Sequence, residues 1–156
     1  EILVWSPSLT PDRLDAELGR ETRSAMRVLG TATRSAMFDE LLSLSDYLSI
    51  HVPYVPHSPP LVGKRELGML PRGAVLVNTS RGALVDEAAL AQALRSGALS
   101  GVGLDVFREE PLPASSPLRK LDGVVLTDHA AWYSEDSIRA LRSRAAKALA
   151  DLLGTE

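Results

Sequence analysis

The chain has 156 residues, of which 45% are hydrophobic and 24% charged, and its formal net charge is -3. This length suits one domain, and the composition supports a folded core. A mildly acidic balance disfavours nucleic acid or an anionic membrane as the main partner. The absence of cysteine excludes disulfides, thiolate metal sites and cysteine nucleophiles, and we expect no metal. No apolar run approaches the roughly 20 residues of a membrane span, so we expect a cytoplasmic protein.

Short β-rich segments alternate with helical patterns along the chain, which is typical of a parallel sheet with crossover helices. The predicted elements, in chain order, are a strand at 2–5, a short helix capped by Thr10, a short strand at 27–29, a helical turn at 38–42, strands at 47–52 and 74–78, a helix capped by Asp86 and ended by Gly97, strands at 102–104 and 124–127, and a final helix that begins after Ser134. The final helix carries an apolar stripe spaced for one buried face, formed by Ile138, Leu141, Ala145, Leu149 and Leu152.

Arg81 follows the predicted strand at 74–78 and precedes the helix capped by Asp86. Ligands of open α/β sheets bind at the carboxyl ends of the strands, so this arginine lies where a ligand is expected. A guanidinium can bind a planar carboxylate through two parallel hydrogen bonds. The alternative is a surface arginine that pairs with Asp86 or Glu87.

Two further strand ends carry titratable groups. Asp105 ends one strand and is followed by a long loop with Glu109 and Glu110, which taken alone could be solvated loop charges. His129 follows the last strand, and histidine can give and take a proton near neutral pH. A structural histidine is the alternative.

These three strand ends should open on the same edge of one parallel sheet. An arginine that anchors an oxo acid, a histidine that protonates the forming alkoxide and a glutamate that holds the imidazolium would together suit proton-coupled hydride transfer. We therefore expect Arg81, Glu110 and His129 to converge on one cleft.

Three segments carry a family resemblance: 78–82, 104–111 and 127–129. They resemble the signature stretches of the D-isomer-specific 2-hydroxyacid dehydrogenases, and the similarity extends in register over residues 38–153. The stretch 130–135 further resembles the branch that contains the C-terminal-binding-protein corepressors. The resemblance implies an NAD(P)-dependent oxidoreductase of a small 2-oxo or 2-hydroxy acid, cytoplasmic and homodimeric when full length.

The resemblance also implies the role of each residue. Arg81 would bind the substrate carboxylate and carbonyl, His129 would be the general acid or base, and Glu110 would hydrogen-bond that histidine. NAD would lie along the same edge, against a set formed by Ser6, Val52, Pro53, Thr79, Ser80, Arg81, Asp105, His129, Ala130, Ala131 and Trp132. Within this set Asp105 would accept a hydrogen bond from the carboxamide of NAD. Trp132 would pack against a substrate tail or belong to the core.

The resemblance implies a Rossmann-like, doubly wound parallel sheet that is incomplete at the N-terminus, because the first strand and the glycine-rich loop of the family are absent. Residues 1–134 would be a partial NAD(P)-binding domain, and 135–156 a helix that returns towards a missing substrate domain. Since the missing strand is central in the usual order, its loss leaves two strand edges unpaired. We therefore expect that this piece alone neither binds cofactor well nor folds cleanly.

The sequence leaves two matters open. Ser6 stands where the family places an acidic residue that binds the ribose of NAD, so NADP is compatible with this chain, although NAD is favoured. A dinucleotide-sensing corepressor-like scaffold and an inactive fragment are the alternatives to an enzyme. The presence of all three catalytic-type residues favours the enzyme, because a scaffold has no chemical need of them.

Overall fold

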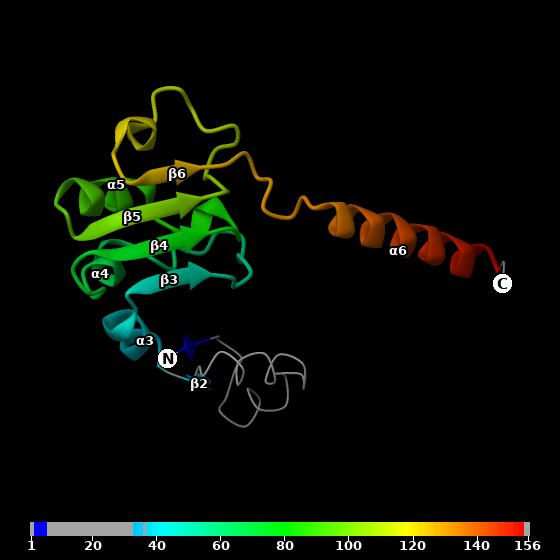
Figure 1. Ribbon diagram of the computed structural model, residues 1–156, viewed down its shortest axis with the longest axis horizontal. Coiled ribbons are helices and arrows are strands. Elements are labelled where there is room, and N and C mark those ends of the chain that lie inside the picture. The colour runs from blue at the N-terminus through cyan, green and yellow to red at the C-terminus, as the bar shows by residue number, and fades with distance from the viewer. Residues whose placement is uncertain (1, 6–32, 36, 155–156) are drawn as a thin grey trace.

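The computed structural model describes residues 2–5, 33–35 and 37–154. Its centre is a parallel sheet with strand order β3-β4-β5-β6, shown in Figure 1. These strands span Tyr47–Ile50, Ala74–Asn78, Leu99–Leu104 and Val124–Leu126. The strand predicted at 74–78 is confirmed to the residue, and the other three differ from prediction only at their ends.

One face of this sheet forms the core. Alternate residues of β3, β4 and β5 are buried there, including Ile50, Leu76 and Leu104. The helices packed with these strands are α3, Phe38–Leu44; α4, Lys64–Leu67; α5, Glu87–Arg95; and the 3-10 turn η2, Pro117–Lys120. The opposite face is open in the described part of the chain, where Tyr47 is 81% and Val125 66% exposed.

Helix α5 begins and ends as its sequence predicts. The Asp86 side chain accepts hydrogen bonds from the backbone amides of Ala88 and Ala89, which satisfies two of the free donors of the first turn. Leu90 and Ala93 are buried, and Gly97 follows the helix with a φ of 68°. The cap thus fixes the start of α5, shortly after the turn that carries Arg81.

A separate two-stranded parallel sheet precedes this body. Strand β1, Ile2–Val4, pairs with β2, Thr33–Ser35. A cavity of about 700 Å³ lies between β1 and β3, lined by Leu3, Trp5 and residues of β3. Among the described residues no strand lies between β1 and β3, so the parallel pairing is interrupted there.

Some expectations are not met or not tested. The final helix, α6, is confirmed at Glu135–Leu153 and is capped by the Ser134 hydroxyl. Its apolar stripe is not buried within the described chain: Leu141, Leu149 and Leu152 are 60%, 57% and 85% exposed. The reason is that α6 projects away from the sheet and packs on no other element (Figure 1). The helix expected after Thr10, the strand at 27–29 and Ser6 lie outside the described residues. No described helix is long and apolar enough to cross a membrane.

Candidate active site at the carboxyl edge of the sheet

The candidate site lies where β4, β5 and β6 end. Hydrogen bonds link the residues that follow each strand: the amide of Asp105 donates to the Asn78 carbonyl, and the amide of Thr127 donates to the Leu104 carbonyl. The three loops therefore start side by side, as expected for parallel strands. Arg81, Glu110 and His129 come from these three loops, one from each.

His129 and Glu110 form a direct pair. The imidazole Nδ1 lies 2.8 Å from Glu110 Oε2, and the two side chains are 43% and 37% exposed. The other carboxylate oxygen, Oε1, accepts a hydrogen bond from the amide of Phe107 at 2.9 Å. The hydrogen bond from His129, followed by that from Phe107, lowers the pKa of Glu110, and the nearby charges of His129 and Arg81 add to this effect. The hydrogen bond expected between Glu110 and His129 is present, while the catalytic roles of the two residues stay predictions.

Arg81 lies at the same edge, close enough to Glu110 for its charge to lower the pKa of that carboxyl. Its Nη1 donates to the carbonyl of Ser80 at 2.7 Å. The alternative pairing with Asp86 or Glu87 is wrong: Asp86 caps α5, and Glu87 Oε1 accepts the amide of Arg108. Within the described chain Arg81 has no carboxylate partner, so its guanidinium is available to an anion.

The turn that carries Arg81 is organised by Asn78, which sequence reasoning missed. Asn78 is fully buried; its Nδ2 donates to the Arg81 carbonyl at 2.9 Å and its Oδ1 accepts from the Ser80 amide at 3.0 Å. Next in the chain is Gly82, where an added Cβ would lie 1.9 Å from the carbonyl carbon of Phe107. The Arg81 turn and the Glu110 loop thus touch backbone to backbone, which only glycine permits.

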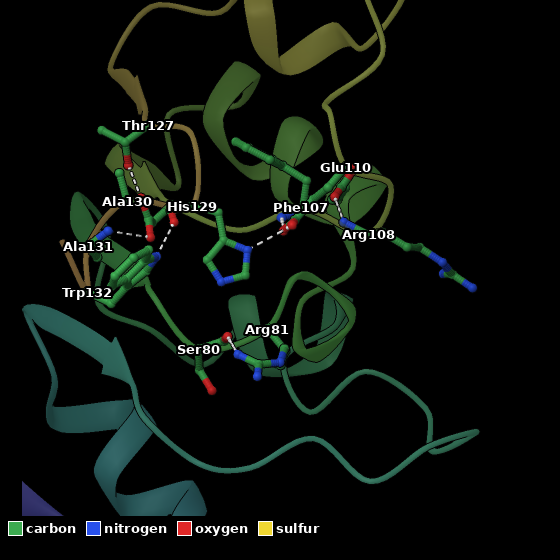
Figure 2. A network of polar contacts seen from close by, with 12 residues as sticks. Ser80, Arg81, Phe107, Arg108, Glu110, Thr127, His129, Ala130, Ala131 and Trp132 are labelled. Atoms are coloured by element: carbon green, nitrogen blue, oxygen red, sulfur yellow. Dashed lines mark hydrogen bonds and ion pairs between the residues drawn. The ribbon is translucent and has the colours of Figure 1, made fainter. Parts of the chain in front are cut away.

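His129 has an unusual backbone. Its φ is 50°, a left-handed conformation that is uncommon outside glycine and is often found at functional sites. The Trp132 Nε1 donates to the His129 carbonyl at 2.9 Å, and the Trp132 side chain is 53% exposed, so it is not a core residue. Figure 2 shows the His129 ring directed towards Glu110, while the side chain of Arg108 points away.

The expected cofactor residues fall into two groups. Val52, Pro53 and Ser80 line, with Arg81, a hollow of about 350 Å³ at the ends of β3 and β4, and Ser80 Oγ donates to the Val52 carbonyl at 2.7 Å. Thr79 is exposed beside them.

The second group is Asp105, Ala130 and Ala131, which lie in contact with one another. The Asp105 carboxylate accepts hydrogen bonds from Thr127 Oγ1 and from the amides of Ala130 and Ala131. Thr127 begins one of the three segments that carry the family resemblance, but no role was predicted for it. No cluster of metal-ligating side chains occurs among the residues described.

Comparison with known proteins finds relatives of this chain. The family model for the D-isomer specific 2-hydroxyacid dehydrogenase, NAD binding domain, matches residues 18–131. A glyoxylate reductase of Korarchaeum cryptofilum is 45% identical over 115 residues, which are 74% of this chain and 33% of that protein. The chain thus spans about a third of that relative's length.

Two solved structures are similar as well. A D-lactate dehydrogenase from Aquifex aeolicus, complexed with NAD and lactic acid, is 30% identical with a TM-score of 0.70, over 82% of this chain and 43% of that one. A D-isomer specific 2-hydroxyacid dehydrogenase from Xanthobacter autotrophicus Py2, in complex with NADPH and MES, is 40% identical with a TM-score of 0.59, over 64% of this chain and 32% of that one. These comparisons lend no support to a corepressor-like scaffold or to its branch.

Proposed function

Because the chain belongs to the D-isomer-specific 2-hydroxyacid dehydrogenase family, we propose that it is the cofactor-binding part of an oxidoreductase that acts on a small 2-oxo or 2-hydroxy acid. The observation that carries this proposal is the His129–Glu110 pair, 2.8 Å apart, beside an arginine that has no carboxylate partner in the described chain. A proton donor and an anion-binding group at one sheet edge are what the reduction of a 2-oxo acid requires.

Arg81 would hold the substrate. Its Nη1 is used by the Ser80 carbonyl, which leaves further donors of the same guanidinium for the carboxylate and carbonyl of an oxo acid. The fixed fork of an arginine orients such a group better than an ammonium does. The hydrogen bonds of Asn78 to this turn would keep the fork in place.

His129 would transfer the proton through Nε2, because Nδ1 faces Glu110. A carboxylate at Nδ1 fixes the tautomer and the ring orientation. The lowered pKa of Glu110 keeps that carboxylate ionised at neutral pH, so it accepts the hydrogen bond from Nδ1 and leaves Nε2 to the substrate oxygen. In the reverse direction Nε2 would accept the proton of the 2-hydroxy acid.

The residues at this edge fit a dinucleotide. The hollow lined by Val52, Pro53 and Ser80 is open at the carboxyl end of the sheet, where such cofactors bind. Thr79, Ala130, Ala131 and Trp132 stand at the rim of the same edge. NAD or NADP, when bound, would supply or accept the hydride. Ser6, the residue expected to bear on the choice between the two cofactors, lies outside the described residues.

The organisation of the whole protein belongs to the same proposal. Residues 1–134 would form the dinucleotide-binding part, and α6 within 135–156 would return to a substrate domain, which would cover its exposed apolar stripe. We place the protein in the cytoplasm as a homodimer, as the resemblance implies.

A substrate panel tests the proposal. Glyoxylate, hydroxypyruvate, pyruvate and 3-phosphohydroxypyruvate would be offered with NADH and with NADPH to a polypeptide that extends this chain to the length of its relatives. We expect the absorbance of NADH or NADPH to fall with at least one of the four oxo acids. Arg81→Ala and His129→Ala should each abolish this turnover. His57→Ala, which changes an exposed histidine of the 53–61 loop, is the control and should retain activity. Turnover that survives in either site variant would retire the role of that residue.

A further inference from the structure

Asp105 is the first residue after β5, and its side chain is buried, with only 4% of the residue exposed. It is the one charged residue in the buried set of the described chain. Burying a carboxylate is costly unless hydrogen bonds compensate. The compensation that Asp105 finds is local and comes from a single segment.

That segment is 127–131, which carries His129. The Asp105 Oδ1 accepts from Thr127 Oγ1 at 2.5 Å and from the Ala130 amide at 2.8 Å, and Oδ2 accepts from the Ala131 amide at 2.9 Å. The backbone carbonyl of Asp105 accepts the amide of His129 itself at 2.8 Å. Asp105 thus binds the loop before, at and after the histidine. Figure 2 shows the loop residues Thr127, His129, Ala130 and Ala131.

These contacts oppose a backbone cost. His129 has a φ of 50°, and a non-glycine residue in the left-handed region persists only where its surroundings impose it. We propose that Asp105 is a positioning residue that holds the 127–131 loop in this conformation and so directs His129 at Glu110. This inference deepens the proposed function, on which it rests for its catalytic meaning.

The chemistry requires a carboxylate at this position. Each of the three donors from the loop meets a carboxylate oxygen, and an asparagine would put an NH2 group against at least one of them. Burial pushes the pKa of Asp105 upward, but the hydrogen bonds from Thr127, Ala131 and Ala130 outweigh it and leave the pKa below its ordinary value. Asp105 is therefore an acceptor for all three donors at neutral pH. Two oxygens with about four lone pairs also leave room for one more donor, such as a carboxamide.

The partner of His129 is anchored independently. Glu110 is held by the Phe107 amide, and the adjacent Arg108 amide is held by Glu87 on α5. A change at Asp105 should therefore move His129 and leave Glu110 where it is. The pKa of Glu110 then reports whether His129 is in place, because the hydrogen bond from His129 is the largest cause of its lowering.

Asp105→Asn tests the proposal in the polypeptide extended to the length of its relatives, with no substrate or cofactor present. Amide hydrogen exchange and the carboxyl titration of Glu110, both followed by NMR, are the measurements. We expect exchange at Ala130 and Ala131 to accelerate about tenfold, as one lost hydrogen bond to a charged acceptor implies. The Glu110 titration should move up towards its ordinary value of 4.5.

Asn78→Ala is the matched control. Asn78 is equally buried at the end of the neighbouring strand, but its side chain binds Ser80 and Arg81 rather than the 127–131 loop. It should accelerate exchange at Ser80 and move the pKa of Glu110 by less than Asp105→Asn does, because the charge of Arg81 is the smallest of the causes that lower that pKa. If both variants move the titration of Glu110 equally, or if Asp105→Asn leaves it unmoved, Asp105 does not position His129.

If Asp105→Asn unfolds the domain, hydrogen-exchange protection is lost at the central amides of Leu76 and Val102. In that case Thr127 offers a milder pair of variants. Thr127→Val removes one donor to Asp105, and Thr127→Ser restores it. We expect Thr127→Val to raise the pKa of Glu110 and Thr127→Ser to leave it at its value in the unaltered protein. Equal behaviour of the two overturns the proposal. Since no turnover is measured, failure of the substrate panel and failure of this inference are separate results.

Discussion

The His129 Nδ1 lies 2.8 Å from Glu110 Oε2, although the two residues stand 19 positions apart in the sequence. They are brought together because each follows the end of one of two adjacent parallel strands, β5 and β6. Nothing between them in the chain has to fold onto the pair. The sheet brings the two loops together. The Phe107 amide then holds Glu110, and Asp105 holds the loop that carries His129.

The pair predicts an acid-dependent stability. The folded-state pKa of Glu110 is lowered from its ordinary value of 4.5, so its contribution is complete above that value and is lost as pH falls through the lower, folded pKa. The free energy of unfolding should therefore fall less steeply between about pH 5 and pH 3 in Glu110→Gln than in the unaltered protein. Denaturant titrations at several pH values measure this, and an unchanged pH slope would contradict it.

Gly82→Ala should be strongly destabilising. The new Cβ would lie 1.9 Å from the carbonyl carbon of Phe107 and 2.4 Å from the amide nitrogen of Arg108. The Arg81 turn and the Glu110 loop would therefore have to move apart. We expect a loss of about 3 kcal/mol or more in unfolding free energy, the upper part of the range for overpacking. Gly101→Ala is the control, because its Cβ would have only ordinary contacts at 3.5 Å and beyond. Similar losses in the two variants would contradict the close approach at Gly82.

Arg81→Lys should weaken substrate binding while leaving the fold intact. A lysine keeps the charge but loses the two parallel hydrogen bonds to a carboxylate, so KM for the oxo acid should rise about tenfold or more. The measurement requires the polypeptide extended to the length of its relatives. Arg108→Lys is the matched control, since that side chain points away from His129 (Figure 2) and should leave KM unchanged. Equal KM values for Arg81→Lys and the unaltered protein would remove Arg81 from substrate binding.

The isolated chain should unfold in more than one step. The buried side chains lie within the β3–β6 body, whereas Trp5 on the β1 side borders the 700 Å³ cavity and stacks on Phe38 with ring centroids 4.5 Å apart. In a Trp132→Phe background, the fluorescence of Trp5 should change at a lower temperature than the far-ultraviolet circular dichroism. One sharp transition in both signals from a monomer would show that the interruption of the sheet costs little.

The sequence predicted best what depends on neighbours in the chain. Asp86 and Ser134 cap their helices as expected, because a side-chain oxygen two or three residues before a free amide is a local arrangement. The pairing of Glu110 with His129 was also predicted, through the resemblance and the rule that parallel strands end at one edge. The strand expected at 27–29 stays untested, while the structure has β2 at Thr33–Ser35.

The sequence could not predict contacts made across loops. Asn78 and Thr127 are ordinary residues until the Arg81 turn and the Asp105 carboxylate lie against them. The need for glycine at position 82 becomes clear only when the backbone of Phe107 is seen to lie against it. The contacts of Asp105 with its own chain were not predicted for the same reason, since nothing in the sequence shows that its carboxylate oxygens face the next loop. Its expected hydrogen bond with the carboxamide of NAD stays a prediction.

The ladder of parallel pairing from β4 to β6 sets a fixed pitch for the site. Adjacent strands lie about 4.8 Å apart, and each of the three loops begins directly after its strand. The points at which the anion-binding and proton-transfer loops leave the sheet are therefore spaced by backbone pairing, which substitutions in the loops do not alter. Within each loop, the side chains of Asn78 and Asp105 then decide where Arg81 and His129 lie.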